Sequence, residues 1–228
     1  MFHTVKQAVR RLLSKYGHAW ILLYVFIYFP WFAYLEQTVT SHFNVIHMAV
    51  DDYIPFLEIF IIPYMLWFVY VSGFILYFFF KEKQDYYKLC AFLFTGMTVF
   101  LIISTLYPNG HYLRPHTFTR NNIFTAMVQW LYRADTPTNL FPSIHVYNSL
   151  GIHFAICNSE CFRNKKRIKA ASFILMTSII LATVFLKQHS VFDVITAFVM
   201  AALMYSFVYV RYPAFSQSKS YKKQLHHV

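Results

Sequence analysis

The sequence predicts an all-α integral membrane protein built as a six-helix bundle. Three observations point to this fold class: an apolar composition, six apolar stretches of spanning length, and lysine and arginine gathered on one side of the resulting layout. Hydrophobic residues make up 58% of the 228 residues and aromatic residues 21%, while charged residues reach only 13%. A soluble domain carries about 25% charged residues. We therefore expect a lipid bilayer to be the solvent.

The predicted helices follow from the length of the apolar stretches, because a helix needs about 20 mostly apolar residues to cross about 30 Å of hydrocarbon. The six stretches are about 18–35, 54–80, 89–106, 141–157, 170–187 and 189–210. The second contains Pro55, Pro63 and Gly73, which favour a tilt or a kink. The last two are separated only near Gln188, which predicts a tight helical hairpin. The first follows a basic start but lacks a small-residue cleavage site, so we expect it to be retained.

Charge gives the orientation of this layout. The segments 1–17, 81–88, 158–169 and 211–228 fall on one side, and they hold 16 of the 20 lysines and arginines. By the positive-inside rule that side is the cytoplasm, so both termini are expected to be basic cytoplasmic tails, 1–17 and 211–228. The net charge of +11 then reflects orientation, and a nucleic-acid partner loses its support. We expect one membrane domain, 1–228, in the cell (plasma) membrane.

Polar residues remain at the outer ends of the spans. His189 and Asp193 lie four residues apart, so they share a helix face, and the carboxylate can orient the imidazole; an ion pair that only stabilises packing explains this spacing too. Ser143 and His145 open the fourth span, where free N–H groups bind anions, although the serine also suits a helix cap. Arg114 follows the third span and can bind phosphate or reach lipid headgroups.

In this order, these segments resemble the type 2 phosphatidic acid phosphatase superfamily. Its pattern is a lysine, six residues and Arg-Pro; then Pro-Ser-x-His; then Ser-Arg, five residues, His, three residues and Asp. The matching pieces here are Arg114-Pro115, Pro142-Ser143-Ile144-His145 and His189-Ser190-Val191-Phe192-Asp193. The resemblance covers about residues 100–205, which we expect to contain the catalytic core.

The resemblance implies a role for each matched residue. His189 would attack phosphorus and form a phosphohistidine, with Asp193 orienting it. His145 would protonate the leaving oxygen and then help to activate the acceptor. Arg114 and Ser143, with the N–H groups at the start of the fourth span, would hold the phosphoryl oxygens. Members of the superfamily need no metal ion or other cofactor.

The chain departs from the pattern in two places, since the lysine falls at Tyr107 and the Ser-Arg pair at Ala182-Thr183. A phosphate monoester carries a charge of about −1.5 to −2 and a diester about −1, so fewer cations favour a diester. Diesters are the substrates of sphingomyelin-synthase-like and inositol-phosphorylceramide-synthase-like relatives, which transfer a headgroup between lipids. Lys187 could instead replace the lost arginine, and Tyr107 could itself contact phosphate. Four further candidates are Arg120, Arg133, His111 and His116.

We therefore expect a membrane enzyme that cleaves or transfers a lipid phosphate at the extracytoplasmic face, with membrane lipids as its partners. Monoester hydrolysis and diester headgroup transfer both stay open.

Two other classes of membrane protein are alternatives to this enzyme. A haem-binding electron carrier would use paired histidines, since several of the 11 histidines lie in or near the spans. His153, deeper in the fourth span, lacks an obvious partner. A transporter or a relative that only binds lipid phosphate is favoured by the lost cations, although the internal symmetry typical of transporters is not evident.

Overall fold

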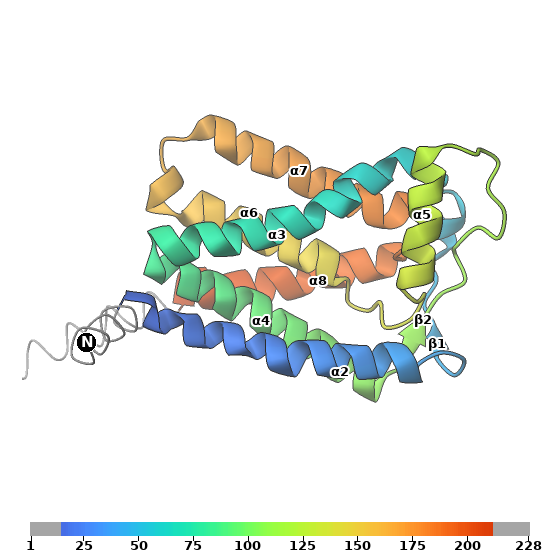
Figure 1. Cartoon of the computed structure of the whole chain (residues 1–228), viewed down its shortest axis with the longest axis horizontal. Helices are drawn as coiled ribbons and strands as arrows, with labels where there is room; N and C mark the ends of the chain where they lie inside the picture. The colour runs from blue at the N-terminus through green and yellow to red at the C-terminus, as the bar shows by residue number, and fades with distance from the viewer. Residues whose placement is uncertain (1–14, 212–228) are drawn as a thin grey trace, which may run out of the picture.

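The computed structural model describes residues 15–211, and its helices run back and forth along one axis (Figure 1). The helices are α2 (Val25–Thr38), α3 (Ile61–Lys81), α4 (Lys83–Leu106), α5 (Ile123–Ala134), α6 (Ile144–Asn158), α7 (Lys166–Phe185) and α8 (Val191–Tyr205). Short helical turns extend or link them: η1 (Gly17–Tyr24), η2 (Ala49–Asp52), η3 (Glu58–Phe60), η4 (Glu160–Phe162) and η5 (Ser206–Arg211). The predicted all-α membrane bundle is confirmed.

Within residues 15–211, five helical segments are long and apolar enough to cross a membrane: Gly17–Thr38, Glu58–Lys81, Lys83–Leu106, Lys166–Phe185 and Val191–Arg211. Each overlaps one predicted stretch, and the tight hairpin expected near Gln188 is the short link between α7 and α8. The fourth stretch becomes α6, which has 15 residues and spans about 22 Å at 1.5 Å per residue. Its helix begins only after Ser143, so it is shorter than the other five. A sixth crossing stays a prediction.

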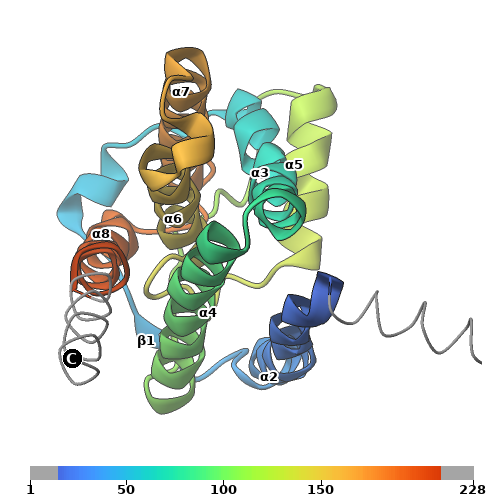
Figure 2. The ribbon, with the colours of Figure 1, turned by 90° about the vertical axis from the view of Figure 1, so that its left-hand side faces the viewer.

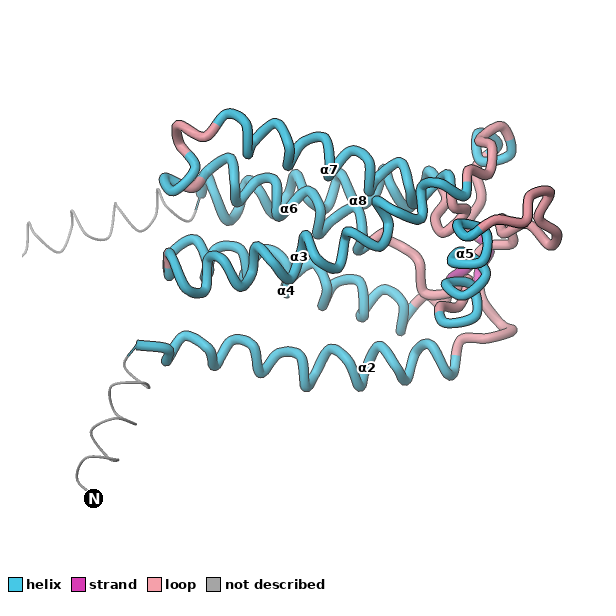
Figure 3. The backbone as a smooth tube through the Cα atoms, turned by 45° about the horizontal axis from the view of Figure 1, so that its top comes forward, coloured by secondary structure: helices cyan, strands magenta, loops and turns pink. Residues whose placement is uncertain are grey.

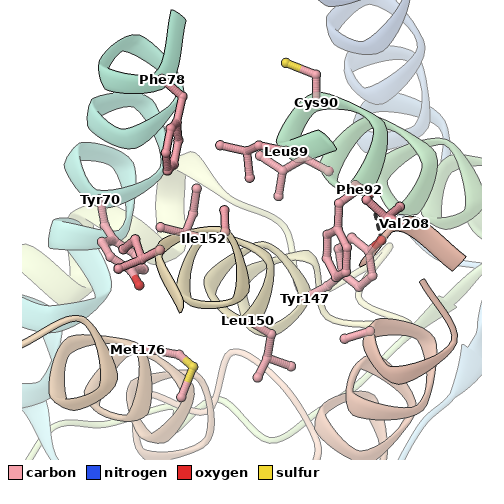
Figure 4. Packing of buried hydrophobic residues seen from close by; sticks show 14 of the residues in the cluster. Tyr70, Phe78, Leu89, Cys90, Phe92, Tyr147, Leu150, Ile152, Met176 and Val208 are labelled. Carbon is pink, nitrogen blue, oxygen red and sulfur yellow. Dashed lines mark hydrogen bonds between the residues drawn. The ribbon is translucent and has the colours of Figure 1, made fainter. Parts of the chain in front are cut away.

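Helix α6 lies at the centre of the bundle, surrounded by α3, α4, α7 and α8 (Figure 2). Its contact with α4 depends on two glycines. A Cβ added at Gly96 would lie 2.0 Å from the ring of Tyr147, and one at Gly151 would lie 2.6 Å from the ring of Phe92. The two rings stack with their centroids 4.7 Å apart (Figure 4). Small residues are what lets membrane helices approach this closely.

The two ends of the bundle differ in composition. One end carries the α3–α4 and α6–α7 connections with their basic residues, among them Lys81, Lys83, Arg163 and Lys165. The other end, called the site end below, carries the starts of α3, α6 and α8 (Figure 1). The predicted basic tails, 1–17 and 211–228, fall almost wholly outside the described residues.

Loops and one unexpected helix cover the site end. The α2–α3 loop, residues 39–57, contributes β1 (Asn44–Val45), which pairs in parallel with β2 (Asn109–Gly110) after α4. Helix α5 lies across the bundle axis at this end (Figure 3). The sequence did not predict it, because 12 residues with apolar side chains on one face are too short to register as a span. Its buried Val128 and Leu131 pack in one cluster with Ile61 and Leu186.

Candidate active site

The N-termini of α6 and α8 lie together at the site end (Figure 1). His145 is the second residue of α6, and His189 lies just before α8. The centroids of the two imidazole rings are 5.7 Å apart. Asp193, in the first turn of α8, accepts a hydrogen bond from Nδ1 of His189 at 3.3 Å. The structure thus brings together the three residues to which the resemblance assigns catalysis.

A short turn, residues 186–190, determines where His189 lies. The backbone N–H of His189 donates to the carbonyl of Thr183 at 3.0 Å. Ser190 then caps α8, since its Oγ accepts from the N–H of Phe192 at 3.2 Å. Oδ2 of Asp193 accepts from the N–H of Ser190 at 3.0 Å. This is the same oxygen that binds His189, so Asp193 caps the helix and contacts the histidine at once.

His189 is uncharged at neutral pH. Its side chain is buried, and this burial lowers its pKa to about 3, with the positive charge of Arg114 as a further cause. In the tautomer with Nδ1–H directed at Asp193, Nε2 carries the lone pair. The backbone of Leu140 also lies within hydrogen-bond reach of the ring and raises its pKa slightly against the effect of burial. A neutral imidazole whose Nδ1–H is bound by a carboxylate is the form in which histidine can attack an electrophile.

His145 packs between two aromatic side chains of α3. Its ring stacks on Tyr64 with 4.7 Å between centroids and lies 4.3 Å from Trp67. Within residues 15–211, its buried Nδ1 has no hydrogen-bond partner. A buried nitrogen without a partner costs free energy, so this atom is available to a substrate group that enters the site.

Arg114 is the cation nearest to these groups, and its terminal N–H groups are engaged by the protein. Nη1 donates to the carbonyls of Tyr132 at 3.3 Å and Asp135 at 2.7 Å. Nη2 donates to the carbonyl of Thr136 at 3.2 Å and to Oε1 of Gln188 at 2.5 Å. The guanidinium also stacks on the ring of Tyr132. The positive charge of Arg114 lowers the pKa of His189. Its two terminal nitrogens connect the loop after α5 to the turn that carries His189.

The sequence predicts an anion site at the start of α6. Ser143 is fully buried and caps the helix, because its Oγ accepts from the N–H of Val146 at 3.4 Å. The N–H of Ser143 donates to the carbonyl of Asp193 at 3.3 Å, which joins the N-termini of α6 and α8. The N–H groups of Ile144 and His145 belong to the first helical turn, which has no intrahelical acceptor for them. They can donate to a phosphoryl oxygen.

A comparison with protein families identifies this part of the chain. Residues 112–217 match the family model described as the PAP2 superfamily. This part of the chain is thus similar to the PAP2 superfamily. Comparison with curated proteins and with solved structures gave no match. Members of the superfamily are generally phosphatases or phosphotransferases, which supports an enzyme of that type. The family resemblance read from the motifs is confirmed.

Within the matched residues, the ammonium group of Lys187 is bound to the α2–α3 loop. Its side chain is 9% exposed, and Nζ donates to the backbone carbonyl of Asp51 in the α2–α3 loop at 2.6 Å. Tyr107, just before the matched residues, ends α4 and is 47% exposed. Among the described residues it makes no side-chain hydrogen bond. Phosphate contacts by these two residues stay predictions.

The other candidate substitutes lie at different depths. His111 is buried, and its ring accepts from the N–H of Leu113 at Nδ1 while Nε2 donates to the carbonyl of Gln188 at 3.0 Å. Burial lowers its pKa to about 4, so it carries no charge near neutral pH. Arg120 forms an ion pair with Glu58 at 3.3 Å. Arg133 and His116 are exposed and line a hollow beside α5.

Several residues that shape the PAP2 site were not singled out by the sequence. Oδ1 of Asn109 accepts from the N–H groups of Leu140 and Phe141, which fixes the approach to the serine cap of α6. Gln188 binds Arg114, as described above. Asp51 reaches the α8 N-terminus from the α2–α3 loop. No local pattern marks them, because each acts across a long sequence separation.

Proposed function

We propose that this protein transfers or hydrolyses a lipid phosphate through a phosphohistidine on His189, at the extracytoplasmic face of the membrane. The observation that supports this most directly is the uncharged, Asp193-bound His189 facing His145 beside two helix N-termini. Nothing else at the site end combines a free imidazole lone pair with donors for phosphoryl oxygens among the described residues.

The reaction would take place in two halves. In the first, Nε2 of His189 forms a bond to phosphorus while the bond from phosphorus to the leaving oxygen breaks. Protonated His145 gives that oxygen its proton, and the negative charge of the bound substrate favours the protonated form. Asp193 balances the positive charge that develops on His189. In the second half, water or an alcohol attacks phosphorus, His145 takes its proton, and His189 is released.

We further propose a phosphodiester lipid, whose headgroup is transferred, as the preferred substrate. The cations expected by the family pattern are lost at Tyr107 and Thr183. Lys187 is bound to the α2–α3 loop, and the guanidinium of Arg114 faces the carboxylate of Asp135 at 3.7 Å. In the described part of the chain, Arg114 is then the one cation that remains beside the imidazoles where the family pattern expects three, and the single charge of a diester needs fewer cations than a dianionic monoester.

The test uses the purified protein with a phosphomonoester lipid (phosphatidic acid) and phosphodiester lipids, each with and without an alcohol acceptor. We expect a new lipid product without free phosphate when a diester and an acceptor are present together. His189→Ala should abolish product formation and covalent labelling by a radioactive phosphoryl donor, whereas His42→Ala, on an exposed loop, should leave both unchanged. Labelling that persists in His189→Ala would refute the assignment of the nucleophile. Free phosphate from phosphatidic acid as the main product would refute the diester preference alone.

A further inference from the structure

Asp51 lies in the α2–α3 loop, outside the PAP2 match, yet its buried carboxylate is bound to the residues that follow His189. The side chain is 2% exposed. Oδ2 accepts from Oγ of Ser190 at 2.6 Å and from the N–H of Met48 at 2.8 Å. Oδ1 accepts from the N–H of Val191 at 2.8 Å. Three donors thus satisfy a carboxylate that would otherwise be costly to bury.

Lys187, two residues before His189, is bound to the same loop. Nζ of Lys187 donates to the backbone carbonyl of Asp51 at 2.6 Å. Lys187 has a φ of 52°, a left-handed conformation that an L-residue adopts at a cost. The α2–α3 loop therefore makes hydrogen bonds on both sides of His189. It binds Lys187 before the histidine, and Ser190 and Val191 after it.

A helix cap alone does not account for this arrangement. Helix α8 already has its own capping box, formed by Ser190 and Asp193. Asp51 adds a carboxylate from a segment 139 residues away, and binds the cap serine itself. The hydrogen bond that orients His189 is 3.3 Å long, near the upper limit for this kind of bond. A small shift of the turn would break it.

We propose that Asp51, with Lys187, is a positioning residue that holds the His189 turn in its reactive place, so that the α2–α3 loop is part of the catalytic apparatus. This rests on the function proposed above. Asp51 acts through His189 and does not touch the substrate. A displacement of a catalytic group by about 1 Å can cost about 10²-fold in rate, so the loss should appear in kcat.

Three variants test the proposal: Asp51→Asn, Lys187→Met and, as the matched control, Asp52→Asn. Asp52 is the next residue, but its carboxylate is 64% exposed and pairs with His47. We expect Asp51→Asn and Lys187→Met to lower kcat by about 10²-fold with KM nearly unchanged, and to slow phosphohistidine formation equally. Asp52→Asn should behave as the wild type. Each rate is divided by the amount of folded protein, which is measured as the monodisperse peak in size-exclusion chromatography.

The outcomes separate the two proposals. If both Asp51→Asn and Lys187→Met keep the wild-type kcat, or raise KM alone, the positioning role is refuted while the proposed function stands. A lower thermal unfolding midpoint with an unchanged kcat per folded molecule also refutes it, because that is the signature of a purely structural contact. If Asp51→Asn does not fold, Lys187→Met decides, since it leaves the carboxylate in place. If the wild type never labels on histidine, the proposed function itself fails.

Discussion

At Asp193, one carboxylate oxygen serves two neighbours: the N–H of Ser190 at 3.0 Å and Nδ1–H of His189 at 3.3 Å. The spacing of His189 and Asp193 in the sequence is compatible with a helix cap and with an orienting pair, and no pattern separates them. The structure shows why, because both roles use the same first-turn position of α8. The sequence could therefore predict that His189 and Asp193 lie close together. It could not predict that a single oxygen of Asp193 both caps the helix and binds the histidine.

The charge state of His189 leads to a prediction about stability and pH. Burial lowers its pKa from the ordinary value of 6.5 to about 3. The unfolded chain therefore binds a proton between these two values that the folded chain does not. His189 therefore does not lower the free energy of unfolding above about pH 6.5, where it is neutral in both states. As the pH falls from 6.5 towards 3, the unfolded chain gains a proton and the free energy of unfolding decreases.

The measurement compares the thermal unfolding midpoint of the wild type with that of His189→Asn in detergent from pH 7 to pH 4.5. We expect the midpoint of the wild type to fall relative to that of the variant as the pH is lowered. Asp135 titrates in the opposite sense, since burial raises its pKa to about 7, but it is present in both proteins and cancels in the difference. Asp193 contacts His189 directly, so the same pair is also compared in an Asp193→Asn background, which removes the titration of that carboxylate. A difference that stays constant with pH would contradict a neutral buried His189.

At the scale of elements, hydropathy predicted the long helices and missed what joins them. The apolar stretches became α2, α3, α4, α7 and α8 because spanning helices need a continuous apolar surface. Helix α5 was missed because only one of its faces is apolar. The sequence also did not predict the hydrogen bonds that Asn109, in β2, accepts from Leu140 and Phe141. A single asparagine gives no sign of partners about 30 residues away.

The contact of α4 with α6 gives a prediction at this scale. Gly96→Ala places a Cβ 2.0 Å from the ring of Tyr147, which is itself buried and stacked on Phe92. Overpacking of this kind costs about 1–3 kcal/mol. We expect a lower thermal unfolding midpoint in detergent. Gly73→Ala is the matched control, since no atom lies within 4 Å of its added Cβ, and alanine favours a helix over glycine. Equal midpoints for the two variants would contradict the close α4–α6 packing.

For the whole molecule, the sequence predicted an ordered set of motifs at one end of a helix bundle. The family match and the convergence of α6, α8 and the turn between α7 and α8 agree with that expectation. What the sequence could not predict is the share of the site contributed by the first third of the chain. Asp51 binds Ser190, next to His189, and Tyr64 stacks on His145, each from a segment more than 80 residues away. Only folding brings them there.

The orientation of the whole molecule is the last prediction. Basic residues gather at the end of the bundle opposite the site, and positively charged connections stay in the cytoplasm. Cys157 is exposed at the end of α6, on that basic side, Cys161 is half-buried nearby, and Cys90 is buried. Both tests use a Cys161→Ser background. In intact cells, a membrane-impermeant thiol reagent should label Thr119→Cys, at the site end, when Cys157 is also replaced by serine. It should reach Cys157 of the Cys161→Ser protein only after the membrane is permeabilised. Labelling of Cys157 in intact cells, with Thr119→Cys protected, would place the two imidazoles in the cytoplasm and reverse the proposed topology.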